Sequence, residues 1–245
     1  MIETSTERSS NLPSDTFSRR LRWLELALVL AVAFALPVLS SFYLLFSKQS
    51  RSVEYSDARL VSAIIIQALA LAVMFYVVFR QGRRLAELGL SWNLNRLAPQ
   101  VLWAIGLALF AMFASFFTRR AMAETYFVAS GHQLNFRLEK LPNISVSFVT
   151  FVFIVLNGWF EELIVRAFAI TEMEALTRNT TLAVAFSVLF QTSYHFYQGV
   201  PQALSYIPIF LIFSIFYVRK RDIVPVALAH VLIDLISVFV LQHRH

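Results

Sequence analysis

The chain has 245 residues, of which 58% are hydrophobic and only 15% are charged, with a mean hydropathy of +0.65. An average soluble domain carries about 25% charged residues, so this composition excludes a water-soluble globular domain. The absence of cysteine excludes disulfides, thiolate metal sites and a thiol nucleophile. The net charge of +6 does not indicate nucleic-acid binding, because Lys and Arg are spread over short segments between apolar runs.

Residues 1–20 contain Ser, Thr and charged residues but no apolar run, which predicts a disordered cytoplasmic tail. Apolar stretches of the roughly 17 to 25 residues needed to cross a ~30 Å hydrocarbon layer then follow one another. They predict an all-α protein, a polytopic transmembrane helical bundle with about seven spans. The expected spans are residues 23–46, 60–79, 97–117, 144–170, 181–197, 203–218 and 222–241.

The first three spans, within residues 21–143, are typical of a membrane scaffold. Glu25 near one end and Gln67 in mid-span are its main polar groups, and we expect snorkelling or a neighbouring helix to satisfy them. Residues 119–143 are expected to form the longest loop, with room for an interfacial helix. A cytoplasmic N-terminus would place twelve Lys and Arg residues on the inner side and eight on the outer side, which favours that orientation.

The last four spans, within residues 144–245, differ because they carry ionisable side chains. Each such group at mid-membrane costs roughly 2.5 to 3.5 kcal/mol on insertion scales, so the set requires mutual pairing, a polar cavity or both. The residues are Glu161, Glu162, Arg166, His195, His230 and Asp234. We interpret the set as a functional site, and we expect Glu172, Glu174 and Arg178 to form a solvated helix end.

Helical spacing predicts how these side chains pair. Residues four apart lie about 40° apart around a helix, so Glu162 can reach Arg166, and His230 can reach Asp234. Glu161 is turned about 100° from Glu162, which leaves its carboxylate unpaired and able to act as a general base.

The fourth and fifth spans are expected to form an antiparallel hairpin that turns near Arg178. Glu161 and His195 each lie 17 positions from that turn, so they should meet at the same depth in the membrane. His230 lies only nine residues beyond the next turn, at Arg221, and simple counting does not bring it to that depth.

Three motifs follow one another along these helices. They are Glu161-Glu162-x-x-x-Arg166, the histidine His195 after an apolar helix, and His230-x-x-x-Asp234. In this order they resemble the motifs of the CPBP family, also called Abi, which contains CAAX proteases and bacteriocin-processing or immunity proteins. The resemblance covers about residues 144–241, and the sequence LAELGL at residues 85–90 resembles a stretch that often precedes the family's core.

Family members of known activity are intramembrane glutamic endopeptidases, the type II CAAX prenyl proteases among them. The resemblance implies that Glu161 and His195 activate the attacking water, and that Glu162 is an active-site carboxylate supported by Arg166. It implies that His230, with the residue at 234, stabilises the tetrahedral oxyanion. We also expect a peptide or lipidated-protein substrate, no cofactor, and a location in a bacterial inner membrane.

Two positions depart from the family's pattern. The second motif is usually Phe-x-x-x-His, but position 191 is Gln and the nearest upstream phenylalanine is Phe190; we expect this change to affect substrate packing more than chemistry. The third motif often ends in Asn, and here it ends in Asp234. A carboxylate cannot donate as an amide does, so we expect Asp234 to act by holding His230 as an imidazolium.

Two alternatives stay open. Imidazole and carboxylate ligands suit zinc, so a zinc site built from His195, His230, Glu161 and Asp234 is chemically possible, although the local two-histidine clamp of many zinc sites is missing. The chain could also be a non-catalytic member of the same family, such as a bacteriocin immunity or scaffold protein, or a proton-coupled carrier. The absence of an internal repeat argues against a carrier. The motif residues specify neither the substrate sequence nor the oligomeric state.

Overall fold

The computed structural model describes residues 14–46, 56–91, 94–134 and 147–242. In its first half, three long helices are joined by connections that include a short 3₁₀ turn. These elements are α1 (Ser14–Phe46), α2 (Asp57–Arg80), η1 (Leu85–Leu88) and α3 (Leu94–Ser130).

The second half forms four further helical rods within the described residues. The first rod is continuous through α4 (Phe148–Glu161), a π-helical segment η2 (Glu162–Phe168) and α5 (Ala169–Thr177). The others are α6 (Thr180–Tyr194) with the 3₁₀ turn η3 (Phe196–Gln198), α7 (Val200–Ser205) continued by α8 (Ile207–Lys220), and α9 (Val224–Gln242). The expected all-α helical bundle is confirmed, and the described residues contain no strand.

Five of these helices, in the part of the chain that the structure describes, are long and apolar enough to cross a membrane. They are Ser18–Phe46, Asp57–Arg80, Asn95–Ser130, Phe148–Thr177 and Val200–Lys220. The apolar part of α9, Val224–Val240, is shorter, and α6 has only 15 residues. α6 can be short and partly polar because it packs against α1, α5 and α8 rather than facing lipid alone.

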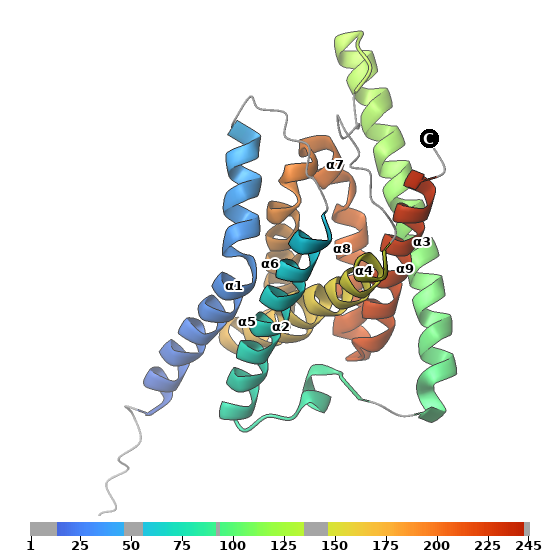
Figure 1. The fold of residues 1–245 in the computed structure, drawn as a ribbon. Helices are drawn as coiled ribbons and strands as arrows, with labels where there is room; N and C mark the ends of the chain where they lie inside the picture. The colour runs from blue at the N-terminus through green and yellow to red at the C-terminus, as the bar shows by residue number, and fades with distance from the viewer. Residues whose placement is uncertain (1–13, 47–55, 92–93, 135–146, 243–245) are drawn as a thin grey trace, which may run out of the picture.

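The ends of two helices differ from the sequence expectation. α1 begins at Ser14, so residues 14–20 of the expected tail are helical, while residues 1–13 lie outside the described part. α3 runs on to Ser130, so the expected loop is helical up to that point; residues 135–143 of the loop are not described. No helix breaker interrupts this stretch, Arg120 pairs with Glu124 one turn later at 2.7 Å, and Gly131 with φ +70° ends the helix. At 37 residues, or about 55 Å, α3 projects beyond the other helices (Figure 1).

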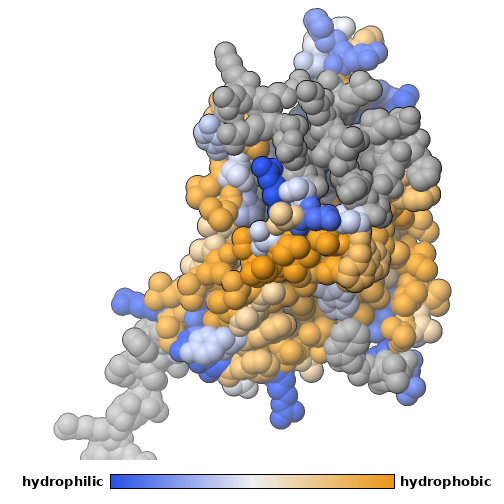
Figure 2. Space-filling view, in the orientation of Figure 1, coloured by the Kyte–Doolittle hydropathy of each residue, from blue (hydrophilic) through white to orange (hydrophobic). Residues whose placement is uncertain are grey.

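The N-terminal helices pack around the C-terminal ones. α1 lies against α6, α2 lies against α4, and α3 lies against α8 and α9. α4 runs across the bundle at a steep tilt, whereas α6, α8 and α9 run more nearly along it (Figure 1). Hydrophobic side chains cover much of the described surface in a broad band, with hydrophilic residues concentrated towards its ends (Figure 2). This distribution suits a surface that faces lipid.

Two carboxylates outside the motifs are held between helices. Glu25 contacts Arg80 and accepts a hydrogen bond of 2.9 Å from Gln81, which is the helix contact expected for it. Glu172, expected at a solvated end, is instead fully buried and pairs with Arg22 at 2.9 Å and with Arg83. The expectation was wrong because α1 and the α2–η1 connection cover that face of α5.

Gly158 marks a close approach of α4 to α9. A Cβ at this position would lie 2.6 Å from Val231 Cγ2 and 3.2 Å from Val231 N. We therefore expect Gly158→Ala to overpack this contact and to lower the free energy of unfolding by about 1–3 kcal/mol. The measurement is the unfolding temperature of the purified protein in detergent.

Gly106→Ala is the matched control, because a Cβ at Gly106 on α3 meets nothing within 4 Å. Alanine is about 1 kcal/mol better than glycine inside a helix, so this variant should be neutral or slightly stabilised. Equal unfolding temperatures for Gly158→Ala and the wild type would contradict the close packing of α4 on α9.

Candidate active site

The first motif lies where α4 changes into the π-helical segment η2. Glu161 is the last residue of α4, and Glu162 begins the seven-residue π-helical segment η2, every residue of which is buried. π-helical turns are rare and are frequently found at functional sites. The segment directs the two adjacent carboxylates to different partners.

Glu162 is neutralised by two basic groups. Arg166 Nη1 donates to Glu162 Oε1 at 3.0 Å, and both side chains are fully buried, at 0% exposure. His230 Nδ1 lies 2.7 Å from the same oxygen, and because a carboxylate accepts, Nδ1 is the donor. The Arg166 guanidinium also lies over the Phe210 and Phe213 rings, at 5.5 and 6.0 Å. The structure therefore brings together the expected Glu162–Arg166 pair and adds a histidine from α9.

Glu161 has a separate set of partners, all uncharged. Asn157 Nδ2 donates to its Oε1 at 3.1 Å, while Gln191 Nε2 and Tyr194 Oη donate to its Oε2 at 2.9 and 2.8 Å. The expectation that this carboxylate is unpaired was wrong. Gln191 and Tyr194 are three residues apart on α6 and so share the face that meets the end of α4 and η2, which helical spacing within one helix could not reveal.

His195 lies at the C-terminal end of α6, among aromatic rings. Its Nδ1 is 2.8 Å from the carbonyl oxygen of Gln191, and since a carbonyl only accepts, Nδ1 carries the hydrogen. In the neutral ring, Nε2 is then an acceptor. The ring centroid lies 4.8 Å from Tyr194, 5.8 Å from Tyr206 and 5.1 Å from Phe210. Within the described residues, no hydrogen bond or ion pair joins His195 directly to Glu161.

His230 lies between two carboxylates. Its Nδ1 donates to Glu162, and its Nε2 is 3.6 Å from Asp234 Oδ2, which is within ion-pair range but too long for a hydrogen bond. The side chains of His230 and Asp234 are 12% and 33% exposed, so the site is partly open on this side. Counting from Arg221 failed to bring His230 to Glu162 because α4 and η2 cross the bundle at a tilt (Figure 1).

Four polar residues at the site were not assigned to it from the sequence. Asn157, Gln191 and Tyr194 contact Glu161, and Gln67 Nε2 donates to Asn157 Oδ1 at 2.7 Å. Asn157 could have been found, because it lies one helical turn before Glu161. Gln191 was noted only as a departure that alters substrate packing; its contact with Glu161 shows that the departure reaches the carboxylate itself.

The described residues contain no group of three or more His, Cys, Asp or Glu side chains arranged to hold a metal ion. Glu161 would be a ligand in the alternative zinc site. Its two oxygens accept three hydrogen bonds from neutral donors, which leaves one of their roughly four acceptor positions open.

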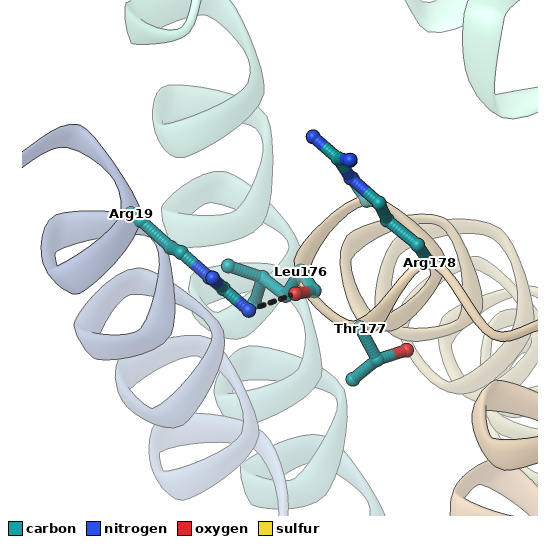
Figure 3. Close-up of a pocket in the computed structure, with 5 residues that line it drawn as sticks. Arg19, Leu176, Thr177 and Arg178 are labelled. Atoms are coloured by element: carbon teal, nitrogen blue, oxygen red, sulfur yellow. Dashed lines mark hydrogen bonds between the residues drawn. The ribbon is translucent and has the colours of Figure 1, made fainter. Parts of the chain in front are cut away.

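A cavity of about 350 Å³ lies elsewhere, at the turn between α5 and α6. It is lined by Arg19, Ala175, Leu176, Thr177 and Arg178, and none of the expected site residues belongs to it. Arg19 of α1 reaches across to donate a hydrogen bond of 2.7 Å to the carbonyl oxygen of Leu176 (Figure 3). This contact caps the C-terminal end of α5, and it is sufficient to explain the position of the Arg19 side chain.

Removing the cation from the buried pair should be far more harmful than removing one from the surface. We expect Arg166→Met to leave Glu162 as a buried charge held by His230 alone, and to lower the free energy of unfolding by about 3–5 kcal/mol. The control is Arg120→Met in the Arg120–Glu124 pair, which has the same spacing but side chains 69% and 63% exposed, and should change stability by less than about 1 kcal/mol. The unfolding temperature and the monodisperse fraction in detergent are measured for both variants. An equal loss of stability in Arg166→Met and Arg120→Met would contradict the buried Glu162–Arg166 pair.

Comparison with known proteins supports the assignment of the C-terminal helices. Residues 143–236 match the family model described as type II CAAX prenyl endopeptidase Rce1-like. No curated protein and no solved structure matches the chain. The matched range contains all three motifs and leaves α1, α2 and α3 outside it. Residues 143–236 therefore resemble an Rce1-like domain, which is consistent with the CPBP (Abi) family, and together with the long apolar helices they support an integral membrane protein.

Proposed function

We propose that this protein is an endopeptidase that hydrolyses a peptide bond in or near the bilayer, with a water molecule activated by Glu161 and His195. One observation carries the proposal. Of two adjacent buried carboxylates, Glu162 is neutralised by Arg166 and His230, whereas Glu161 is held only by neutral donors. Glu161 is thus the carboxylate that keeps its charge available for taking a proton.

In the proposed reaction, water is the nucleophile. Glu161 accepts one water proton, and the His195 Nε2 lone pair accepts a hydrogen bond from the other, which orients the oxygen towards the substrate carbonyl. A bond forms between the water oxygen and the carbonyl carbon, and the carbonyl oxygen becomes an oxyanion. The proton held by Glu161 then passes to the leaving nitrogen as the carbon–nitrogen bond breaks, which returns both side chains to their starting state.

His230 and Asp234 are proposed to stabilise the oxyanion. When both ring nitrogens of His230 carry hydrogens, Nδ1 donates to Glu162 and Nε2 points towards Asp234 across 3.6 Å. That distance leaves the Nε2 hydrogen uncommitted, so it can donate to an oxyanion. Asp234 supports the positive charge on the ring by its proximity, and Arg166 acts as a positioning residue through Glu162.

The setting of the reaction is proposed from charge and apolar surface. The excess of basic residues on one side favours a cytoplasmic N-terminus, and we propose a bacterial inner membrane as the location. The exposed apolar band brings a membrane-bound peptide or lipidated protein close to the site by partition into the bilayer (Figure 2).

Loss of either proposed catalytic group should abolish cleavage. General acid–base groups contribute about 10²- to 10⁴-fold, so Glu161→Gln and His195→Ala should each reduce the rate by at least about 100-fold. The measurement uses proteoliposomes carrying a library of fluorogenic membrane peptides with and without a prenylated C-terminal cysteine motif. Glu124→Gln and His132→Ala, at exposed positions on and after α3, are the matched controls and should keep full activity. Full proteolysis by either active-site variant would overturn the proposal and favour a non-catalytic family member.

The water-activation mechanism proposed here does not use a bound metal. Cleavage should therefore be unchanged after prolonged treatment with 1,10-phenanthroline and EDTA in the same proteoliposomes. A zinc enzyme would instead lose activity on chelation and regain it on addition of Zn²⁺, since its metal would supply the activated water. That second outcome would replace the roles given to Glu161 and His195 with ligand roles.

A further inference from the structure

Gln67 links the N-terminal scaffold to the candidate active site. It lies on α2, outside residues 143–236, and is 8% exposed in the middle of a membrane span. Its Nε2 donates to Asn157 Oδ1 at 2.7 Å, and Asn157 Nδ2 donates in turn to Glu161 Oε1 at 3.1 Å. The Oε1 atom of Gln67 is buried and has no hydrogen-bond partner within the described structure. The amide at position 67 therefore acts as a donor to Asn157 alone.

The direction of this chain of hydrogen bonds is fixed by its last member. An ionised carboxylate can only accept, so Asn157 must turn its Nδ2 towards Glu161. Its Oδ1 then faces α2 and requires a donor there, which Gln67 supplies. If the amide of Gln67 were reversed, its oxygen would face the Asn157 oxygen. If the amide of Asn157 were reversed, its oxygen would face the Glu161 carboxylate. Gln67 thus selects the one orientation of Asn157 that lets it donate to Glu161.

Glu161 needs partners on both of its oxygens to be held in one plane. The terminal torsion of a glutamate side chain is broad and roughly two-fold, so it is easily turned. Gln191 and Tyr194 of α6 hold Oε2, and Asn157 of α4 holds Oε1. Without the Oε1 bond, the carboxylate could rotate about its α6 contacts and lose its alignment with the water.

We infer that Gln67 is a positioning residue of the active site, which acts through Asn157 to fix the plane of the Glu161 carboxylate. The inference rests on the proposed function and extends it to a scaffold helix outside the Rce1-like domain. Small displacements of a reacting group can cost about 100-fold in rate, so partial loss of alignment is expected to be measurable.

Gln67→Met tests the inference because methionine keeps the length of the side chain and removes the donor. We expect kcat to fall about 10-fold, within the range that misalignment can produce, with KM unchanged. The matched control is Gln100→Met on α3. Gln100 is also buried, and its Nε2 donates to Asp222 at 2.9 Å, far from Glu161 in the hydrogen-bond network. Each variant removes the donor of a part-buried glutamine side chain, but Gln100→Met should keep its kcat.

A second readout does not depend on catalysis. In protein labelled with ¹³C-glutamate, infrared difference spectra against Glu161→Gln identify the carboxylate stretch of Glu161. We expect this band to shift in Gln67→Met and to stay in place in Gln100→Met. An unmoved band in Gln67→Met, or a kcat equal to that of Gln100→Met, would overturn the positioning role.

The two proposals fail in different ways. If Glu161→Gln cleaves normally, the proposed function fails, whatever Gln67→Met does. If Glu161→Gln is inactive but Gln67→Met keeps both kcat and the infrared band, the proposed function stands and only the inference on Gln67 is overturned.

Discussion

The structure depends on how two adjacent carboxylates are satisfied inside a membrane protein. Glu161 and Glu162 are both buried, and two negative charges so close together could not both be kept in an apolar setting without compensation. The π-helical start at Glu162 sends one carboxylate towards Arg166 and His230 and leaves the other among amide and hydroxyl donors. This division of partners distinguishes a carboxylate held by two basic side chains from one held by neutral donors.

The N-terminal helices contribute contacts to the Glu161 side of the site. α2 reaches Glu161 through Gln67 and Asn157, and Phe34 of α1 stacks on the ring of Tyr194 at 4.6 Å. At the other end of the same rod, Arg22 and the α2–η1 connection hold the buried Glu172. The rod that carries Glu161 is therefore fixed at two levels by helices outside the Rce1-like domain, which limits its freedom to rotate about its axis.

Much of this arrangement could be predicted from the sequence. Apolar length gave the order of the helices, and spacing within one helix gave the Glu162–Arg166 pair, because both depend on local geometry. Contacts between helices could not be predicted in the same way. Two of the donors to Glu161, Gln191 and Tyr194, lie on α6 and meet the carboxylate because of the tilt of α4, and the burial of Glu172 depends on which helix covers α5. Gln191 shows the difference most clearly, since its position was singled out but its partner was not.

We propose that Glu161 and His195 share one water molecule beneath the membrane surface. The most direct measurement is an experimental structure of the protein in lipid nanodiscs, at a resolution that shows ordered water. The account predicts a water within about 3 Å of both a Glu161 carboxylate oxygen and His195 Nε2. A dry contact between these side chains, or side chains that point into separate spaces, would contradict it.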